Sequence, residues 1–256
     1  MDFAFFHLFL NANNAFMSVY LALEIFAILV PLIYSYDKKL RFYVKIKSVV
    51  LSLVLIGSLY ILGDILFTKY GIWGFNPKYH SNIILLDLPL EEWLFFIVIP
   101  YASLFLHDTL IYLFPNIQLS NWQTHSLSAI LVACLGVVVL MNPEKTYTAI
   151  YGSVAIFAIF LASLGSSQLL NRFYLTFMVI LVPFFLVNSV LTGSFISEEV
   201  VWYNNSENLG IRIFTVPVED ISYAFSLILF NLLLINKLKR FFAKRTVNRQ
   251  SIRLWR

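Results

Sequence analysis

Charged residues are scarce in this chain. Asp, Glu, Lys and Arg make up 12% of its 256 residues, about half of the roughly 25% that is usual for a soluble domain. Hydrophobic residues reach 60%, and the mean hydropathy is +0.80. So little polar surface cannot cover a water-facing globule, which excludes a soluble enzyme or a soluble binding module. Most of the chain is therefore expected to lie in lipid.

Cysteine and histidine are also rare. The single cysteine, Cys134, has no partner for a disulfide within the chain and is expected to pack inside a hydrophobic span. The four histidines do not show the paired spacing of metal ligands. The sequence therefore predicts neither a metal site nor a cofactor.

Long hydrophobic runs dominate instead. Seven runs approach the roughly 20 residues that cross a bilayer, and the fourth and fifth are the shortest. The predicted spans are Ala15–Tyr34, Val49–Phe67, Trp93–Leu113, Ser126–Met141, Tyr147–Leu164, Phe173–Leu191 and Val216–Ile235. The predicted fold class is an all-α integral membrane protein with about seven transmembrane helices.

Basic residues gather in two segments, between the first and second spans and after the seventh. With seven spans, these two segments lie on the same side of the membrane. The positive-inside rule then predicts an external N-terminus and a cytoplasmic C-terminus, in the cell (inner) membrane. The basic tail is expected to lie on anionic membrane lipids rather than to bind nucleic acid.

An internal repeat is visible in the acidic residues. The segment Pro89-Leu-Glu-Glu92 opens the third span, and Pro217-Val-Glu-Asp220 opens the seventh, 128 positions later. Two matches of this kind in one membrane chain indicate a direct repeat. Because a span between the repeats restores the chain direction, both motif loops are expected to face the same side and to line one pseudo-symmetric site.

Further residues recur around these motifs. The sequence predicts a first repeat at 15–125, a linking helix at 126–145, a second repeat at 146–236 and a basic tail at 237–256. The recurring residues are Trp73 and Asn76 with Trp202 and Asn204 in the loops, and Asp64 with Asn188 near the ends of the second and sixth spans.

The four acidic residues of the motifs have two possible interpretations, one structural and one functional. Proline starts helices well, so Glu91, Glu92, Glu219 and Asp220 fall in first turns, where the helix dipole stabilises negative charge. The structural reading is that they only stabilise helix ends. The functional reading is that each pair holds one proton between two carboxyl groups, so that one member donates a proton while the other accepts one. Such a site performs acid–base chemistry without metal or cofactor.

Aromatic residues accompany the acids. Glu91 shares a helix face with Phe95, and Glu219 with Tyr223, both at a spacing of four. Aromatic faces stabilise cations, so these residues would stabilise a carbocation formed by protonating an alkene. The alternative is an interfacial aromatic belt. Arg212 either orients Glu219 or Asp220 or anchors the chain at the interface.

These motifs resemble those of the membrane lycopene cyclases of the cofactor-free type, which occur as two small subunits or as one fused chain. The resemblance covers roughly residues 18–236 and follows the fused form. It rests on the two acidic motifs together with Asp64 to Thr68, Gly71 to Asn76, Asn188 to Gly193, Trp202 to Asn204, and Gly210 to Arg212. It also implies a helical bundle like that of the UbiA-type prenyltransferases. Prenyl transfer itself is disfavoured, because Asp64 has no second acid four residues later.

The resemblance implies that the linear ψ-ends of lycopene are cyclised to β-rings, giving γ-carotene and then β-carotene. This redox-neutral isomerisation protonates a terminal double bond, closes the ring and removes a ring proton. The expected partners are lycopene, membrane lipids and other carotenoid enzymes.

We hypothesise that Glu91 and Glu219 are the principal acid and base, with Glu92 and Asp220 as proton-sharing neighbours. The sequence leaves open which half donates. Residues expected to line the substrate and cation are Asp64, Trp73, Asn76, Phe95, Phe96, Asn188, Trp202, Asn204, Arg212 and Tyr223. Three other functions remain open: a carotenoid hydratase in which water traps the same cation, a membrane transporter, and a non-catalytic scaffold.

Overall fold

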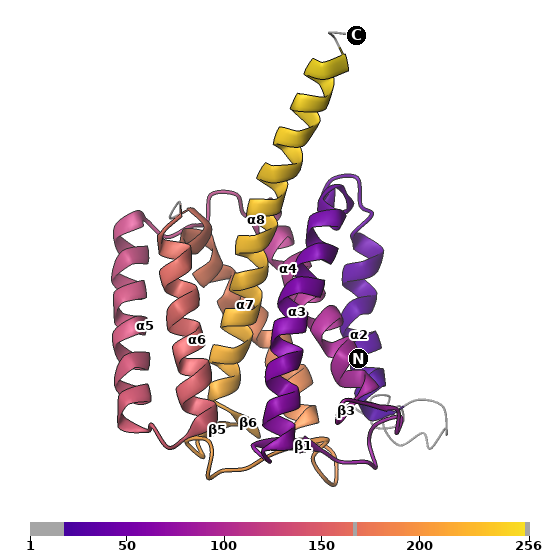
Figure 1. The fold of residues 1–256 in the computed structure, drawn as a ribbon, viewed down its shortest axis with the longest axis vertical. Helices are drawn as coiled ribbons and strands as arrows, with labels where there is room; N and C mark the ends of the chain where they lie inside the picture. The colour runs from indigo at the N-terminus through magenta and orange to yellow at the C-terminus, as the bar shows by residue number, and fades with distance from the viewer. Residues whose placement is uncertain (1–17, 166–167, 254–256) are drawn as a thin grey trace.

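The computed structural model describes residues 18–165 and 168–253, and seven helices run roughly side by side through this part of the chain (Figure 1). Six of them are long and apolar enough to cross a membrane, whereas the first, α2, has 16 residues. The helices are α2 (Val19–Tyr34), α3 (Ile46–Lys69, preceded by a 3-10 turn at Phe42–Lys45), α4 (Leu90–Leu113), α5 (Asn121–Met141), α6 (Thr146–Ser163), α7 (Gln168–Leu191) and α8 (Glu219–Arg253). The predicted all-α membrane fold is confirmed; residues 15–17 of the predicted first span lie outside the described residues.

Two helix boundaries differ from the prediction for identifiable reasons. Helix α5 begins at Asn121 rather than Ser126, because Ser120 and Gln123 form a reciprocal capping box. Its first turn is polar, so hydropathy alone misses it. Helix α8 continues to Arg253, well past Ile235. Arg and Lys favour helices almost as well as Leu, so a basic segment extends a helix that a hydropathy window ends.

The chain also forms short strands that the sequence did not predict. They are β1 (Trp73–Phe75), β2 (Ile84–Leu85), β3 (Leu88–Pro89), β4 (Val201–Tyr203), β5 (Arg212–Ile213) and β6 (Val216–Pro217). The hairpins β2–β3 and β5–β6 are repeat copies: Ile84 pairs with Pro89 in one, and Arg212 with Pro217 in the other. Each places the proline directly before the acidic turn of the following helix.

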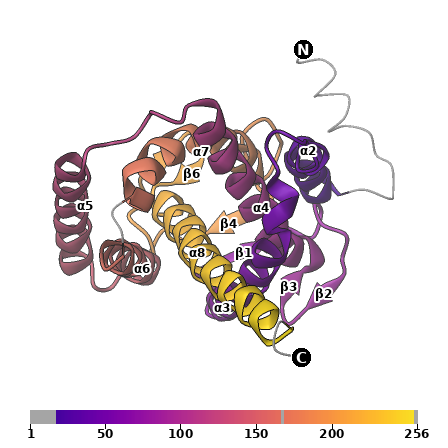
Figure 2. The same ribbon diagram turned by 90° about the horizontal axis from the view of Figure 1, so that it is seen from above.

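The two halves have the same order of elements and interlock. The first half comprises α2, α3, the β1–β3 loop and α4, and the second comprises α6, α7, the β4–β6 loop and α8. Helix α3 packs against α8 of the other half, and α7 packs against α4. Helix α5 stands at the edge, beside α6 (Figure 2). Cys134 on α5 is exposed, so the expectation that it is a packing residue is wrong, because α5 turns most of its surface outward.

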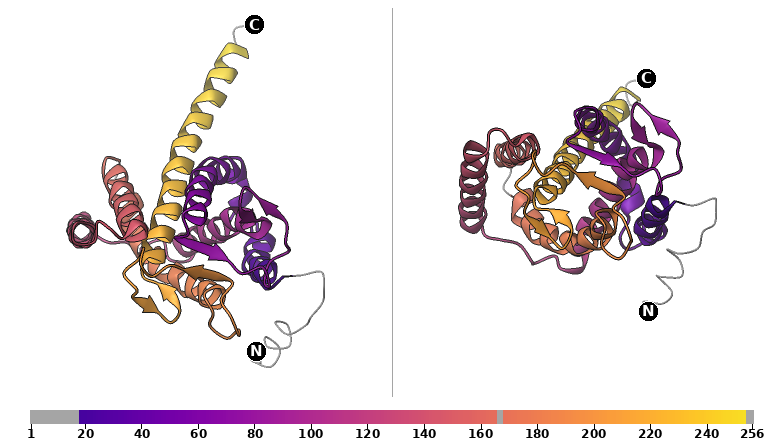
Figure 3. Two further views of the ribbon diagram at one scale, coloured as in Figure 1. Left: turned by 60° about the horizontal axis from the view of Figure 1, so that its bottom comes forward. Right: turned by 90° about the horizontal axis from the view of Figure 1, so that it is seen from below.

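A two-stranded ribbon joins the halves at the motif end of the bundle. Strands β1 and β4 pair antiparallel around Gly74 and Trp202. Outside the ribbon, the Asn76 amide donates to the Val200 carbonyl at 2.8 Å, and the Asn204 amide donates to Ile72 at 2.9 Å. These two bonds are exchanged between equivalent positions, so the ribbon lies on the pseudo-two-fold axis. The three short sheets gather at one end of the bundle, and α8 extends beyond the other end (Figures 1 and 3).

Close packing at Gly74 gives a first prediction. A Cβ atom at this position would lie 2.3 Å from Cζ2 of the Trp202 indole, so Gly74→Ala must push the indole or the ribbon aside. We expect a loss of about 1–3 kcal/mol in unfolding free energy, measured as a lower thermal midpoint in detergent. The matched control is Gly136→Ala on α5, where an added Cβ meets nothing within 4 Å. A Gly74→Ala protein as stable as Gly136→Ala would contradict the close packing.

Candidate active site

A pocket lies between the two halves, next to the motif loops. Three acids reach it, Asp64 from α3, Glu92 from α4 and Asp220 from α8, and each is at most 6% exposed. Helices α2, α3, α4, α6, α7 and α8 and strands β1 and β4 all contribute to its wall. The remaining lining is mainly aromatic and aliphatic and includes Tyr20, Trp73, Phe75, Phe95, Ile99, Tyr147, Phe184, Asn188, Leu191, Val201, Tyr203, Tyr223 and Leu227.

On the first-half side, two carboxyl groups contact each other. The side chains of Asp64 and Glu92 lie within interaction range of each other. Each also accepts from a tyrosine: the Tyr20 hydroxyl donates to Glu92 at 2.6 Å, and the Tyr223 hydroxyl donates to Asp64 at 3.0 Å. Since two neighbouring carboxylates repel each other in a buried site, such a pair is expected to hold one proton between them.

On the second-half side, one carboxyl group accepts hydrogen bonds from two tyrosine hydroxyl groups. The hydroxyl groups of Tyr147 and Tyr203 donate to the two oxygens of Asp220, the second at 3.0 Å. Burial, and then the negative charge of Asp220, raise the pKa of Tyr203 well above its usual value. Tyr203 therefore keeps its proton and remains a donor. The position equivalent to Asp64 is Asn188, whose amide donates to the Phe184 carbonyl at 3.0 Å.

The first acid of each motif lies outside the pocket. Glu91 accepts the Ser81 amide at 2.7 Å and the Ser18 hydroxyl at 2.6 Å. Glu219 likewise accepts the Leu209 amide at 2.8 Å and the Thr148 hydroxyl at 2.7 Å. Ser81 and Leu209 are equivalent in the repeat, so both acids fix a loop onto the start of a helix. The structure thus places the second acids in the pocket, where we had expected the first acids to act.

Of the predicted aromatic residues on the two motif helices, some line the pocket and one lies outside it. Phe95 and Tyr223 line the pocket, as expected, but each lies three residues after the second acid of its motif. Positions three and four apart both face one another on a helix, so the spacing alone could not distinguish Glu91 from Glu92. Phe96 lies behind the pocket wall, 6.3 Å from Tyr60 between ring centroids.

The two motif tryptophans are not equivalent. Trp73 lines the pocket and meets the Tyr147 ring edge-on at 5.1 Å between centroids. Trp202 is exposed and covers Gly74 from outside the pocket. Its neighbour Tyr203 lines the pocket, because successive residues of a strand point to opposite faces. At the repeat offset of 128, Trp202 corresponds to Gly74 and Tyr203 to Phe75.

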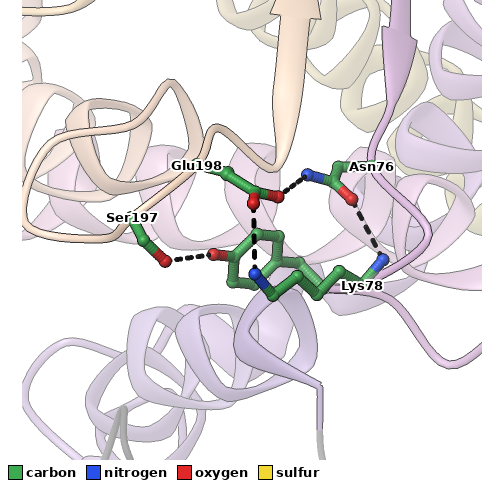
Figure 4. Close-up of polar contacts among 5 residues, drawn as sticks. Asn76, Lys78, Ser197 and Glu198 are labelled. Atoms are coloured by element: carbon green, nitrogen blue, oxygen red, sulfur yellow. Dashed lines mark hydrogen bonds and ion pairs between the residues drawn. The ribbon is translucent and has the colours of Figure 1, made fainter.

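The remaining predicted loop residues hold the loops together rather than line the pocket. Asn76 donates to Glu198 at 3.0 Å and accepts the Lys78 amide at 3.1 Å, and the Lys78 ammonium lies 3.2 Å from Glu198 (Figure 4). Hydrogen bonds from Asn76 and Lys78 hold the pKa of Glu198 below its usual value. The hydroxyl groups of Tyr79 and Ser197 add a bond of 3.1 Å. This network ties the first motif loop to the second.

The second motif loop is fixed by equivalent contacts. Asn204 accepts the Ser206 amide at 3.0 Å, as Asn76 does for Lys78. Arg212 donates to the Thr215 carbonyl at 2.8 Å and to Asn205 at 2.9 Å, and its guanidinium lies 5.6 Å from the Tyr203 ring centroid. Arg212 therefore anchors the loop and sits beside the tyrosine that donates to Asp220.

The repeated architecture agrees with a comparison against known families. A family model described as "Lycopene cyclase" matches residues 17–110 and 144–238, which correspond to the two halves and together cover most of the chain. This chain belongs to the lycopene cyclase family. It is accordingly a membrane enzyme of carotenoid biosynthesis with cyclase activity and a carotenoid substrate. No curated protein and no solved structure matches it, so the likeness to UbiA-type bundles stays a prediction.

The cyclase site contains two residues that the sequence analysis missed. Tyr20 and Tyr147 hold equivalent places, since their amides donate to the equivalent carbonyls of Tyr79 and Glu207. Their offset is 127 rather than 128, and no flanking motif marks them. In the described residues, no three His, Cys, Asp or Glu side chains are grouped to hold a metal ion.

A further buried acid, Glu24 on α2, was also missed. It is 2% exposed, neither carboxyl oxygen has a hydrogen-bond partner among the described residues, and it interacts electrostatically with Glu92 and Glu91. It lies one helical turn after Tyr20. The signal available in the sequence was that Glu24 is the lone acid of the first predicted span.

Glu24 gives a second prediction. A buried polar group without a partner destabilises a protein by about 1–3 kcal/mol, so Glu24→Met is expected to raise the thermal midpoint of the purified cyclase. The control is Glu144→Met at an exposed glutamate between α5 and α6, which should leave the midpoint unchanged. A lower midpoint for Glu24→Met would show that the carboxyl group is stabilised by contacts that the structure lacks.

Proposed function

We propose that this cyclase closes the ψ-ends of lycopene into β-rings by protonation and deprotonation, giving γ-carotene and then β-carotene. The observation that carries the proposal is the meeting of Asp64, Glu92 and Asp220 in one mainly apolar pocket. A hydrocarbon end fits such a wall, and carboxyl groups are the side chains that can hand over and take up a proton there. The enzyme class proposed is therefore an isomerase, an intramolecular lyase.

The two sides of the pocket are suited to different steps. The Asp64–Glu92 pair holds a proton between two carboxyl groups, so we assign it the role of acid. Hydrogen bonds donated to a carboxyl group favour its charged form, and Asp220 receives two of them. We therefore assign Asp220 the role of base. These assignments replace Glu91 and Glu219, which we had first expected to be the principal acid and base without deciding which half donates.

The proposed reaction balances without an oxidant or reductant. A proton moves from the Asp64–Glu92 pair to the terminal alkene, forming a C–H bond and a tertiary cation. The internal alkene attacks this cation and closes the ring, and Asp220 removes a ring proton to restore a double bond. Trp73, Phe95 and Tyr223 line the pocket, and aromatic faces stabilise an intermediate cation.

We also propose the orientation of the cyclase in the cell membrane. The basic segment between α2 and α3 and the end of α8 lie at the end of the bundle opposite the motif loops (Figure 1). The positive-inside rule then gives an external N-terminus and a cytoplasmic C-terminus, with the catalytic pocket nearer the outer face. Other carotenoid enzymes in the same membrane are proposed partners, since they supply the substrate and consume the product.

Expression in cells that accumulate lycopene tests the function. The extracted pigments should contain β-carotene with γ-carotene as the intermediate, both of the same mass as lycopene. Unchanged lycopene would overturn cyclisation. Products heavier by one water would instead identify a hydratase, in which water rather than Asp220 ends the cation.

A further inference from the structure

A second pocket lies at the end of the bundle opposite the catalytic one. It is formed by the turn before α3 together with α4, α7 and α8, near the point where α8 extends beyond the other helices (Figure 1). Its lining is mostly polar, and neither the carotenoid chemistry nor the motif loops use it. The lining residues are Lys45, His107, Asp108, Ile111, Gln118, Gln168, Leu169, Arg172, Leu232, Ile235, Asn236, Lys239 and Arg240.

Positive charge in this pocket is only partly balanced. Lys45 forms an ion pair with Asp108, the single acid in the lining. Arg172, Lys239 and Arg240 form no ion pair with a described residue. Arg172 is held by the Pro115 carbonyl at 3.1 Å and by Gln118 at 3.4 Å, so its guanidinium is fixed in place. Three cations therefore line one pocket without a counter-charge among the described residues, and an anion that joined them would relieve their mutual repulsion.

The pocket combines this charge with an apolar floor. Leu169, Leu232 and Ile235 line the pocket; Leu232 and Ile235 belong to the hydrophobic core, and Leu169 packs against it. The cations come from the ends of helices that carry long apolar stretches, so the pocket lies at the depth of lipid headgroups. A basic pocket between transmembrane helices suits the phosphate of an anionic lipid, with acyl chains against the neighbouring apolar surface.

We propose that this pocket binds the phosphate headgroup of an anionic phospholipid. Arg172 supplies a planar donor suited to phosphate oxygens, and Lys239 and Arg240 add charge from the next helix. The bound lipid would hold α4, α7 and α8 together at the end remote from catalysis. Inorganic phosphate offers the same charge without acyl chains, so the lipid and the free anion can be separated by experiment.

The test is thermal unfolding of the full-length protein in detergent with three additives. Phosphatidylglycerol is expected to raise the midpoint by roughly 2–4 °C or more, and phosphatidylcholine and inorganic phosphate should not. An equal shift with inorganic phosphate would overturn the lipid assignment, and no shift with any additive would overturn the site.

Charge variants show whether the pocket causes the shift. Lys239→Gln combined with Arg240→Gln should remove most of it, with Lys239→Gln alone as a milder form if the double variant folds poorly. The matched control is Lys38→Gln with Lys39→Gln, which removes two exposed charges from the loop at the same end. If the control loses as much of the shift as the pocket variant, binding depends on general surface charge and the proposal fails.

Discussion

Glu92→Gln is expected to lower the rate of cyclisation about 10²–10⁴-fold, the usual loss when a general acid is removed. Glutamine keeps the shape of the side chain and can still accept from the Tyr20 hydroxyl, which donates at 2.6 Å. It cannot share a proton with Asp64. The loss would therefore fall on chemistry rather than on folding. The measurement is the ratio of cyclic to linear carotenoids, normalised to the amount of protein in the membrane.

The informative control is the neighbouring Glu91→Gln. Glu91 accepts three hydrogen bonds, from Ser81 and Ser18, and lies outside the pocket. Its variant should lose some stability and retain cyclisation to within about tenfold. If Glu91→Gln is inactive while Glu92→Gln still makes β-carotene, the first acid of the motif is the catalytic one and the assignment is reversed.

Asp220→Asn is expected to stop the reaction after the cation has formed. The Asp64–Glu92 pair can still protonate the alkene, but no carboxylate remains to remove the ring proton. We expect β-ring formation to fall about 10²–10⁴-fold, with the cation diverted to products heavier by one water or to rings that lose a different proton. Mass spectrometry of the extracted pigments separates these outcomes.

Two further variants serve as controls for Asp220→Asn. Glu219→Gln replaces the acid that holds Leu209 on the start of α8 and should leave the mixture of products unchanged. Glu144→Gln, at an exposed site, controls for the loss of a surface charge. Ordinary yields of β-rings from Asp220→Asn would remove Asp220 from the mechanism. If Asp220→Asn made no product while Glu92→Gln made hydrated products, Asp220 would be the acid and Glu92 would belong to the base.

The two halves share a fold but not a set of acids. Asp64 in the first half corresponds to Asn188 in the second. Glu24, one turn after Tyr20, corresponds to Tyr151, one turn after Tyr147, and Tyr151 lies in the aromatic cluster with its ring 4.4 Å from that of Tyr223. The first half thus concentrates carboxyl groups, whereas the second surrounds one carboxylate with phenols. This asymmetry is the physical basis for assigning the acid to one half and the base to the other.

Much of the fold could be predicted from the sequence because bilayer thickness and helix rise tie hydrophobic length to span number. The repeat was visible because Pro89 and Pro217 precede acids at one fixed offset. The hairpins were not visible. Their turns place non-glycine residues in the left-handed region, with φ of 50° at Leu86 and 55° at Phe214, where sequence rules expect glycine or asparagine.

Within the site, the sequence predicted the acidic motifs and Asp64 but not how the motifs face the pocket. One residue along a helix turns a side chain by about 100°, so Glu91 and Glu92 point in different directions although both begin α4. Which of them enters the pocket depends on how α4 rotates against α2 and α7. Tyr20 and Tyr147, which bond the inner acids, come from distant helices, and only packing brings them there.

The most direct test of the central claim is the mass of the product that the purified protein makes from lycopene in heavy water. Protonation by solvent-exchangeable carboxyl groups predicts an isomer of lycopene that carries a single deuterium for each ring formed. Rings formed without deuterium would contradict proton transfer from Asp64 and Glu92, and lycopene recovered unchanged would contradict cyclisation itself.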